Sequence, residues 1–462
     1  MMTRSVNPKI LREYDVRGVY GRDWDENDAY LLARAFGSDV IAAGGRRVAV
    51  GRDGRISTPA IEKAVCEGLS ASGLEVLRIG LGPSPMAYFA GFHLEVDACV
   101  MVTASHNPGE YNGMKMTLKR KPFFGQQIRH LGARIQEQDF VEGQGSIRDE
   151  PVFEAYVKRL MEDFQQHYCH GRPLKIVWDA GNGAAGEVIE ALAARLPGEH
   201  ILLNTEIDGT FPAHHPDPVV EENLIQLRQA VKDEKADLGL AFDGDGDRLG
   251  VLDNEGTILW GDQLVQLYAS EVLKTHPGAV IMADVKASQV LFDEIARMGG
   301  QPLMWRTGHS LIKTKMAEVS SPLAGEMSGH IFFADRYYGY DDALYSAIRT
   351  LGITSLMQGP LSDWTKSIPR AQSTPELRID CEGRADKHEV VATIKSQLVA
   401  KGIGFNDLDG LRVTYPHGWW LIRASNTQEV LVARAEAQED EHLQALVREL
   451  SGYLSEMNLS IS

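Results

Sequence analysis

One local pattern recurs along this chain: an apolar segment the length of a buried strand, then a turn, then an amphipathic helix. It appears in "RRVAVGRDGRISTPAIEKAVCEGLSASG", "LKIVWDAGNGAAGEVIEALAARL" and "AVIMADVKASQVLFDEIARMGG". In the first copy we expect Thr58 as the helix N-cap and Pro59 as the first helical residue. Strands that alternate with helices of this length predict parallel or mixed α/β sheets joined by crossover helices.

The pattern changes after residue 367, where the chain reads as strand, helix, strand, strand and a last helix over 439–455. This predicts a smaller α+β unit at the C-terminal end. A chain of 462 residues is too long for one hydrophobic core. We therefore expect four units, and we place their boundaries at residues 1–152, 153–255, 256–367 and 368–462.

The charge balance excludes several classes of partner. Asp and Glu total 64 against 47 Lys and Arg, so the formal net charge is -17. A nucleic acid or an anionic membrane would require a basic face, so neither is expected as a partner. An anionic small substrate stays possible where cationic side chains converge.

The four cysteines lie far apart and form no C-x-x-C pair, which argues against a disulfide framework and a zinc site. The start of the chain has no apolar segment of signal-peptide length. No run of about 18 apolar residues occurs anywhere in the sequence. We expect a cytoplasmic protein.

The segment "LGLAFDGDGDRLGVLD" places Asp243, Asp245 and Asp247 in a glycine-rich loop between two apolar strands. Three carboxylates this close repel one another unless a cation neutralises them. An EF-hand is excluded, because its sixth position is Arg248 and its twelfth is Asn254. Oxygen ligands alone favour Mg²⁺ or Ca²⁺, and three protein carboxylates leave room for water or substrate oxygens.

The stretch "VTASHNPGEYNGMK" follows an apolar segment over 98–102 and contains Ser105 and His106 side by side. Both residues could serve only the turn that Asn-Pro-Gly imposes. A serine on a loop at the carboxyl end of a strand is also well placed for an active site. The sequence has no G-x-S-x-G element, which weakens an esterase interpretation.

A dinucleotide-like fingerprint, Gly181-x-Gly183-x-x-Gly186, follows one predicted strand, and Glu199 lies near the expected acidic position. The run lies in the middle of the chain and fits a plain strand-to-helix turn equally well. An NAD-binding oxidoreductase is therefore carried as a remote alternative.

Two further polar loops are candidates for ligand binding. In "LAGEMSGHIFF", alternate positions carry groups that could contact a polyol, or could form an ordinary polar loop: Glu326, Ser328 and His330. In "GWWLIRASNTQEVLVARAEA", a guanidinium and hydroxyls suit a phosphate, although a hairpin turn would explain the small polar residues: Arg423, Ser425, Asn426 and Thr427.

Taken in this order, five motifs resemble the α-D-phosphohexomutase family over essentially the whole chain. They are "YDVRG" at 14–18, "TASHNP" at 103–108, "DGDGDR" at 243–248, "GEMSGH" at 325–330 and "RASNT" at 423–427. The resemblance implies an α/β fold of four domains around a central cleft. Three of these domains are similar mixed-sheet α/β domains, and the fourth is a smaller C-terminal α+β domain.

The resemblance also implies roles for individual residues. Ser105 would carry a phosphoryl group and bind Mg²⁺ together with Asp243, Asp245 and Asp247. The implied catalytic set is Ser105, Lys115, His330, Arg17, His106 and Arg248. The implied substrate-binding set is Tyr14, Lys286, His309, Glu326, Ser328, Arg423, Ser425, Asn426 and Thr427.

The implied activity is reversible phosphoryl transfer between hexose 1-phosphate and hexose 6-phosphate through a 1,6-bisphosphate intermediate. Glucose or mannose 1,6-bisphosphate would act as activator. Met327, between Glu326 and Ser328, favours mannose and glucose phosphates, with phosphoglucosamine mutase as the alternative. The glycine run then becomes a turn and the NAD interpretation drops out. We expect a monomer or a weak homodimer.

Overall fold

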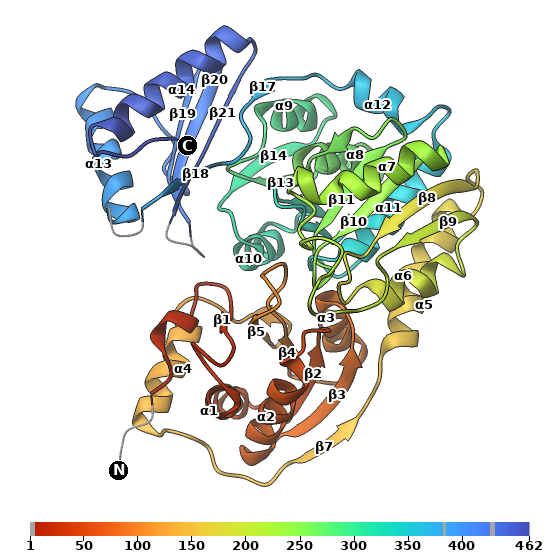
Figure 1. Ribbon diagram of the computed structural model, residues 1–462, viewed down its shortest axis with the longest axis vertical. Coiled ribbons are helices and arrows are strands. Elements are labelled where there is room, and N and C mark those ends of the chain that lie inside the picture. Colours follow the sequence, from red (N-terminus) through yellow and green to blue (C-terminus); the bar gives the residue numbers. More distant parts are fainter. Residues whose placement is uncertain (1–4, 382–384, 426–429, 462) are drawn as a thin grey trace.

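The computed structural model describes residues 5–381, 385–425 and 430–461 (Figure 1). The chain forms α/β units on mixed sheets followed by a C-terminal α+β unit, as the repeated pattern predicts. Within the described ranges, no helix combines the length and the apolar character needed to cross a membrane.

The first sheet has the strand order β1-β5-β4-β2-β3-β7, with β6 paired to β5. Its strands are β1 (Val16–Val19), β2 (Arg47–Arg52), β3 (Glu75–Leu81), β4 (Ala98–Val102), β5 (Tyr111–Leu118), β6 (Lys121–Pro122) and β7 (Ser146–Asp149). Its helices are α1 (Glu26–Ala42), α2 (Thr58–Ala71), α3 (Ser84–His93) and α4 (Gln126–Glu137), after a short 3₁₀ turn at Pro8–Ile10. Because side chains alternate along a strand, Val48 and Val50 of β2 join the core under α1, α2 and α4, whereas Ala49 joins the core under α3.

The second sheet has the order β12-β11-β10-β8-β9. Its strands are β8 (Leu174–Asp179), β9 (Gly198–Leu203), β10 (Leu238–Phe242), β11 (Leu249–Asp253) and β12 (Ile258–Leu259). Its helices are α5 (Phe153–Asp163), α6 (Gly186–Ala193) and α7 (Ile225–Glu234), with a π turn at Phe164–Tyr168 and a 3₁₀ turn at Glu221–Leu224.

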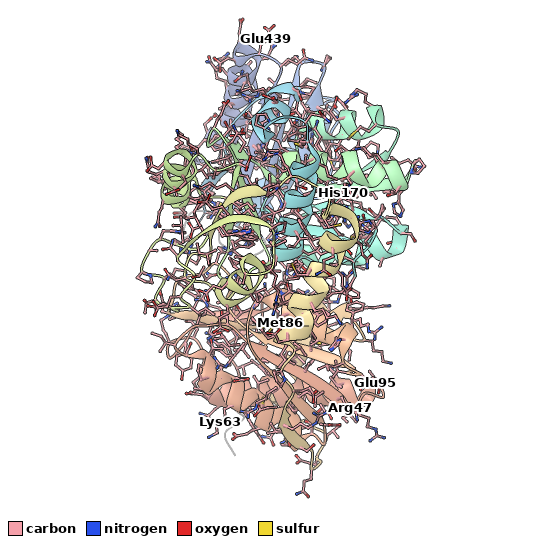
Figure 2. All side chains as sticks on the ribbon, turned by 90° about the vertical axis from the view of Figure 1, so that its right-hand side faces the viewer. Arg47, Lys63, Met86, Glu95, His170 and Glu439 are labelled. Atoms are coloured by element: carbon pink, nitrogen blue, oxygen red, sulfur yellow. The ribbon has the colours of Figure 1, made fainter. Side chains whose placement is uncertain are left out.

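The third sheet has the order β14-β13-β15-β16. Its strands are β13 (Val280–Asp284), β14 (Gln301–Trp305), β15 (Leu323–Gly325) and β16 (Ile331–Phe333). Its helices are α8 (Gly261–Thr275), α9 (Gln289–Arg297), α10 (His309–Val319), α11 (Ala343–Leu356) and α12 (Leu361–Ser367). One continuous apolar core runs from α3 of the first unit through the second and third sheets. Figure 2 labels Met86 of α3, which is buried in this core at the seam between the units.

The three α/β sheets share one topological feature. In each, a parallel strand is followed by an antiparallel neighbour: β4 by β5, β10 by β11, and β15 by β16. The loops between these pairs therefore leave the carboxyl end of a parallel strand, where α/β sheets commonly place ligand sites. These loops carry Ser105, the three aspartates and the Glu326–His330 stretch.

The C-terminal sheet is antiparallel, with the order β17-β21-β20-β19 and with β18 paired to β21. Its strands are β17 (Gln372–Ser373), β18 (Leu377–Asp380), β19 (Leu411–Tyr415), β20 (Gly418–Ala424) and β21 (Val430–Ala437), with helices α13 (Lys387–Ala400) and α14 (Asp440–Ser455) (Figure 1). The sequence predicted two strands after α13, which is wrong: the chain also turns at Pro416 and His417, so β19, β20 and β21 are separate. Proline has no backbone N–H for a ladder, which accounts for the break.

The start of α2 also differs from the prediction. Thr58 is the first helical residue rather than the N-cap, and the N-cap Ser57 makes no side-chain capping bond. The Thr58 hydroxyl instead donates to Asp53 Oδ1 at 2.8 Å. A charged acceptor at the end of β2 competes successfully for this hydroxyl.

Asp342 is a fully buried carboxylate at the N-terminus of α11. It accepts hydrogen bonds from the Tyr345 backbone N–H and from the hydroxyls of Tyr156 and Tyr337, but no cation pairs with it in the described part of the chain. Burial raises the pKa of Asp342 to about 7, although these hydrogen bonds oppose the shift.

The raised pKa of Asp342 makes the folded state bind a proton more tightly than the unfolded state. Its contribution to stability is therefore present below about pH 4 and is lost as the pH rises towards 7. We predict that Asp342→Asn flattens the change of Tm between pH 4.5 and pH 7 relative to wild type, measured by calorimetry. An unchanged slope in the variant would show that another group controls this window.

Candidate active site

The three aspartates of the β10–β11 loop form a buried carboxylate cluster. Asp243, Asp245 and Asp247 are fully buried, and one oxygen from each lies within 4.8 Å of the others. Burial, followed by repulsion from Asp245 and Asp247, raises the pKa of Asp243 well above its usual range. Asp245 Oδ1 is buried without a hydrogen-bond partner among the described residues. A hard divalent cation with oxygen ligands fits this arrangement, so the cluster could hold a metal ion.

Ser105 follows β4 and lies against this cluster. Its Oγ donates to Asp243 Oδ2 at 2.9 Å, and its backbone N–H donates to Thr103 Oγ1 at 3.0 Å. Its φ of 52° lies in the left-handed region, which costs a non-glycine residue roughly 1–2 kcal/mol. Because other contacts must compensate for this cost, the loop around Ser105 is held in a defined conformation.

His106, the next residue, is 3.3 Å from the Ser105 hydroxyl through Nδ1. Burial, together with the guanidinium groups of Arg248 and Arg17, lowers the pKa of His106 well below its usual range. Its imidazole is therefore neutral at physiological pH.

The serine and aspartate loops touch backbone to backbone at glycines. A Cβ on Gly244 would lie 2.5 Å from the Ser105 carbonyl oxygen. The serine loop also meets the loop after β9, since a Cβ on Gly109 would lie 2.6 Å from the Gly209 carbonyl oxygen. Only residues without a side chain allow this approach. The "DGDGD" spacing thus serves loop contact as well as the convergence of carboxylates.

Lys115 of β5, the strand that follows the serine loop, forms ion pairs with the aspartate loop. Its ammonium group is 2.6 Å from Asp245 Oδ2 and also pairs with Asp247 Oδ2. Burial opposes the positive charge, but these two carboxylates outweigh it and raise the pKa of Lys115 well above its usual value. Lys115 is therefore a buried cation that donates hydrogen bonds.

The β15–β16 loop brings His330 to the same cluster from the third unit. Its Nε2 is 3.2 Å from Asp247 Oδ1, and its Nδ1 lies 2.8 Å from Ser328 Oγ and 3.2 Å from Glu326 Oε2. Burial opposes protonation, but Asp247 in particular raises the pKa of His330 to about 9. His330 is therefore an imidazolium at neutral pH, held on both sides.

The two arginines of the predicted catalytic set, Arg17 and Arg248, lie beside the serine loop and His330. Arg17 Nη1 donates to Asn107 Oδ1 of the serine loop at 2.6 Å, and the same guanidinium pairs with Asp15. Arg248 lies 3.3 Å from His330 through Nε and 3.9 Å from Asp217 through Nη1.

Tyr14 and His309 join the first unit to the third. The Tyr14 hydroxyl donates to the Thr307 carbonyl at 2.9 Å, and its ring meets His309 edge-on at 5.8 Å between centroids. The rings of His309 and His330 stack at 5.6 Å. These contacts place both residues next to the predicted catalytic group.

The predicted phosphate loop begins at the end of β20. Arg423 Nε pairs with Asp409 Oδ2 at 3.1 Å, and the same oxygen accepts the Thr307 backbone N–H at 2.9 Å. Lys286 of the third unit pairs with Glu376 of the C-terminal unit at 2.9 Å. Ser425 is buried beside Arg423, whereas Asn426 and Thr427 lie outside the described residues.

Comparison with known proteins places these features in one family. Residues 8–142 match the family domain described as "Phosphoglucomutase/phosphomannomutase, alpha/beta/alpha domain I". Domains II and III of the same family match residues 154–256 and 260–371, and its C-terminal domain matches residues 376–452. The chain belongs to the phosphoglucomutase/phosphomannomutase family. The resemblance and the four-domain fold class inferred from the motifs are thereby confirmed.

Individual relatives match over nearly the whole chain. A phosphomannomutase/phosphoglucomutase of Pseudomonas aeruginosa is 44% identical over 437 residues, which cover 95% of this chain and 93% of that protein. A phosphoglucomutase of Neisseria gonorrhoeae is 40% identical and covers 94% of each chain. The crystal structure of a family protein from Burkholderia thailandensis has a TM-score of 0.92 at 42% identity and covers 98% of each chain.

The glycine run of this family member forms the strand-to-helix turn between β8 and α6. A Cβ on Gly186 would lie 1.9 Å from the Thr205 carbonyl oxygen, and a Cβ on Gly183 would lie 2.9 Å from the Gly244 carbonyl oxygen. Close backbone packing therefore explains both glycines, with Gly183 against the aspartate loop and Gly186 against the segment after β9. This agrees with the interpretation of the run as a strand-to-helix turn, and the activity that the family supports is the mutase rather than the remote NAD alternative.

Several residues of the site carried no motif that sequence reasoning could use. Ser84 donates to Asp245 Oδ2 from the start of α3. Asp341, Asp247 and His330 form a second group of buried side chains whose possible metal-ligand atoms lie close together. Asp341 also pairs with Lys313 at 2.7 Å and lies 3.4 Å from His309. The sequence signal that could have drawn attention to Asp341 is the pair of adjacent acids at residues 341 and 342.

We predict that Gly244→Ala destabilises the contact between the serine and aspartate loops, because the new methyl group would overlap the Ser105 carbonyl oxygen. We expect a loss of about 1–3 kcal/mol in the free energy of unfolding, measured by urea denaturation. Gly404→Ala is the matched control, because a Cβ there would meet nothing within 4 Å. Equal stability of the two variants would contradict the backbone contact.

Proposed function

We propose that this chain interconverts hexose 1-phosphates and hexose 6-phosphates of mannose, glucose or both. The proposed carrier is a phosphoserine at Ser105, and the proposed intermediate is a hexose 1,6-bisphosphate. The observation that carries the proposal is the position of the Ser105 hydroxyl, 2.9 Å from Asp243 within a carboxylate cluster suited to a cation. Membership of the phosphoglucomutase/phosphomannomutase family supports the same activity.

The charges around Ser105 suit phosphoryl transfer rather than acyl transfer. Phosphoryl transfer depends mainly on positioning and on neutralising charge at the transferring group. Lys115 and His330 are both cationic at neutral pH, because buried carboxylates raise their pKa values. Arg17 and Arg248 lie beside the serine loop and beside His330. Ser105 consequently needs no neighbouring histidine as its base, and the lowered pKa of His106 makes that imidazole a weak proton acceptor.

In the proposed cycle, a free hydroxyl of the bound hexose phosphate attacks the phosphorus of phospho-Ser105. The bond from phosphorus to Ser105 Oγ breaks and the new bond to the sugar oxygen forms. The hydroxyl proton passes to a base, and Ser105 Oγ, which keeps the electron pair of the broken bond, takes a proton from an acid. The bisphosphate then turns over in the site, and its other phosphate returns to Ser105. Lys115 and His330 are the proposed acid and base. Because both are cations in the site without substrate, the one that accepts the sugar hydroxyl proton must first lose its own proton, while the other donates to the departing Ser105 oxygen.

The proposed metal ligands are Asp243, Asp245, Asp247 and Ser105, and the ion is Mg²⁺. Bound there, Mg²⁺ would neutralise developing charge on the transferring phosphoryl oxygens. Asp243 connects the two loops, because its Oδ2 accepts from the Ser105 hydroxyl and its Oδ1 accepts from the backbone N–H groups of Asp247 and Arg248 in its own loop. Glucose or mannose 1,6-bisphosphate is the proposed activator, since it can supply the first phosphoryl group to Ser105.

The remaining candidates are proposed to hold the substrate. Arg423 and Ser425, with Asn426 and Thr427, would bind the phosphate that does not react, from either end of the sugar. Lys286 and His309 would orient the sugar, and Glu326 and Ser328 would contact its hydroxyls. Because both of these last residues also contact His330 Nδ1, substrate binding and the orientation of the imidazole are coupled.

Met327, between the two polyol-binding candidates, supports mannose and glucose phosphates as substrates, with phosphoglucosamine mutase as the alternative. The test is a phosphorus NMR time course with Mg²⁺ and catalytic glucose 1,6-bisphosphate. Mannose 1-phosphate, glucose 1-phosphate and glucosamine 1-phosphate are offered separately. Conversion of the first two to 6-phosphates is the expected result. Preference for glucosamine 1-phosphate would support the alternative, and no conversion by folded protein would contradict the mutase.

We predict that Ser105→Ala abolishes turnover, with a loss of at least about a thousandfold in kcat, because the phosphoryl carrier is removed. Binding of glucose 1-phosphate, measured by calorimetry, should stay within about threefold of wild type, since the proposed substrate contacts come from other loops. A variant that retained near-normal turnover would exclude Ser105 as the carrier.

Removal of divalent metal should stop turnover, and Mg²⁺ should restore it. Because only the folded cluster binds the ion, Mg²⁺ at a hundred times its Kd should raise the free energy of unfolding by about 2.7 kcal/mol. Asp245→Asn should remove most of this stabilisation, whereas the exposed Asp233→Asn should retain it. Equal Mg²⁺ stabilisation of both variants would place the cation elsewhere.

The expected cytoplasmic location and the monomeric or weakly dimeric state stay predictions.

A further inference from the structure

Arg55 ends the stretch "GRDGR" at residues 51–55, which begins at the end of β2, and its side chain is 0% exposed. Its guanidinium has five N–H donors, and all five have partners. Nε donates to Asp53 Oδ2 at 3.1 Å, and the other four N–H groups donate to backbone carbonyls.

All four of these carbonyls belong to the serine loop and the start of β5. Nη2 donates to the carbonyls of Ser105 and Asn107, each at 2.6 Å. Nη1 donates to the carbonyls of Pro108 at 2.6 Å and Tyr111 at 3.1 Å. The loop is therefore wrapped around one planar cation, which a lysine with a single donor atom cannot reproduce.

The same hydrogen-bond network also holds the backbone N–H of Ser105. Asp53 Oδ2 accepts from the Thr103 hydroxyl at 2.7 Å, and Thr103 Oγ1 in turn accepts from the Ser105 backbone N–H. Arg55, Asp53 and Thr103, here named the Arg55 clamp, thus bind Ser105 at both its N–H and its carbonyl. A serine with φ of 52° needs such external support.

The second unit packs against the outer side of the clamp. A Cβ on Gly209 would lie 2.5 Å from the Arg55 Cα, and the Phe211 ring lies 5.1 Å from the Arg55 guanidinium carbon. The clamp therefore lies between the serine loop and the unit that carries the aspartate loop, where a shift of either loop would change the distance from Ser105 to Asp243.

We propose that the Arg55 clamp is a positioning device for the phosphoryl carrier, which sets the direction of the Ser105 hydroxyl towards Asp243. This inference rests on the proposed role of Ser105 as carrier. Arg55 does not contact the reacting atoms; it acts through the backbone of the loop. A misplacement of about 1 Å at a reacting atom can cost about a hundredfold in rate.

The test compares Arg55→Lys with Arg52→Lys. Arg52 is the matched control, because it precedes Arg55 on the same segment but pairs with Glu62 at 3.1 Å, away from the serine loop. Phosphoryl uptake onto Ser105 from glucose 1,6-bisphosphate is followed by quenched-flow intact mass spectrometry. For Arg55→Lys we expect a rate about a hundredfold lower with an unchanged amplitude per protein, and KM for glucose 1-phosphate within about twofold. Arg52→Lys should match wild type in all three.

The amplitude separates positioning from folding. A reduced amplitude with a normal rate would indicate a misfolded fraction and would overturn the proposal, as would a normal rate and amplitude in Arg55→Lys. Where Arg55→Lys fails to fold, Thr103→Val tests the same clamp, with an expected loss of about tenfold in rate. An unchanged rate in folded Thr103→Val would equally overturn it.

Hydrogen exchange tests the clamp independently of the reaction. The amides of residues 105–111 should exchange faster in Arg55→Lys than in wild type, while those of β4 stay unchanged. If wild-type protein takes up no phosphoryl group, the proposed function fails, and the exchange experiment still reports whether Arg55 holds the loop. Unchanged exchange over 105–111 would overturn the clamp itself.

Discussion

The structure depends on the neutralisation of three buried carboxylates that one loop brings together. Asp243, Asp245 and Asp247 cannot all be charged in a buried site without nearby positive groups. Lys115 comes from the first unit and His330 from the third, so the charge balance of the second unit's loop is completed by its neighbours. The ion pairs that neutralise the aspartate loop thereby fix the positions of three units relative to one another. The same carboxylates raise the pKa values of Lys115 and His330, so both side chains carry the positive charge that suits phosphoryl transfer.

The three α/β sheets also share a topology that brings their loops to the candidate site. Each α/β sheet places its chemical loop where a parallel strand is followed by an antiparallel neighbour, so the loop leaves the carboxyl end of the parallel strand. Repetition of one fold thus supplies equivalent positions to three different sets of side chains: a serine, a carboxylate cluster and a polar trio. The C-terminal unit differs, because its candidate loop follows β20 in an antiparallel sheet, and it meets the third unit through Asp409 and Glu376.

Much of the candidate site could be identified from the sequence, because its residues lie in short contiguous motifs. The alternating aspartates, the serine after β4 and the Glu326–His330 stretch were all recognisable from residue type and spacing. Residues that act by long-range contact were not. Ser84 and Asp341 contact the aspartate cluster from elements distant in sequence. The sequence alone gives Arg55 no role, because its contacts with the serine loop are known only from the structure. The errors at Thr58 and at the turn after β19 were local, where an acceptor at the end of a strand and a proline determined the outcome.

The sequence alone determined the α/β class, the order of the motifs and the types of group available for chemistry, because these depend on local periodicity and composition. Only the tertiary structure decided which groups meet, that Ser105 points to Asp243, and that Lys115 and His330 are cations while His106 is neutral. The physical reason is that pKa values and loop conformations depend on burial and on neighbours contributed by other units. These neighbours lie far away along the chain and come together only when it folds.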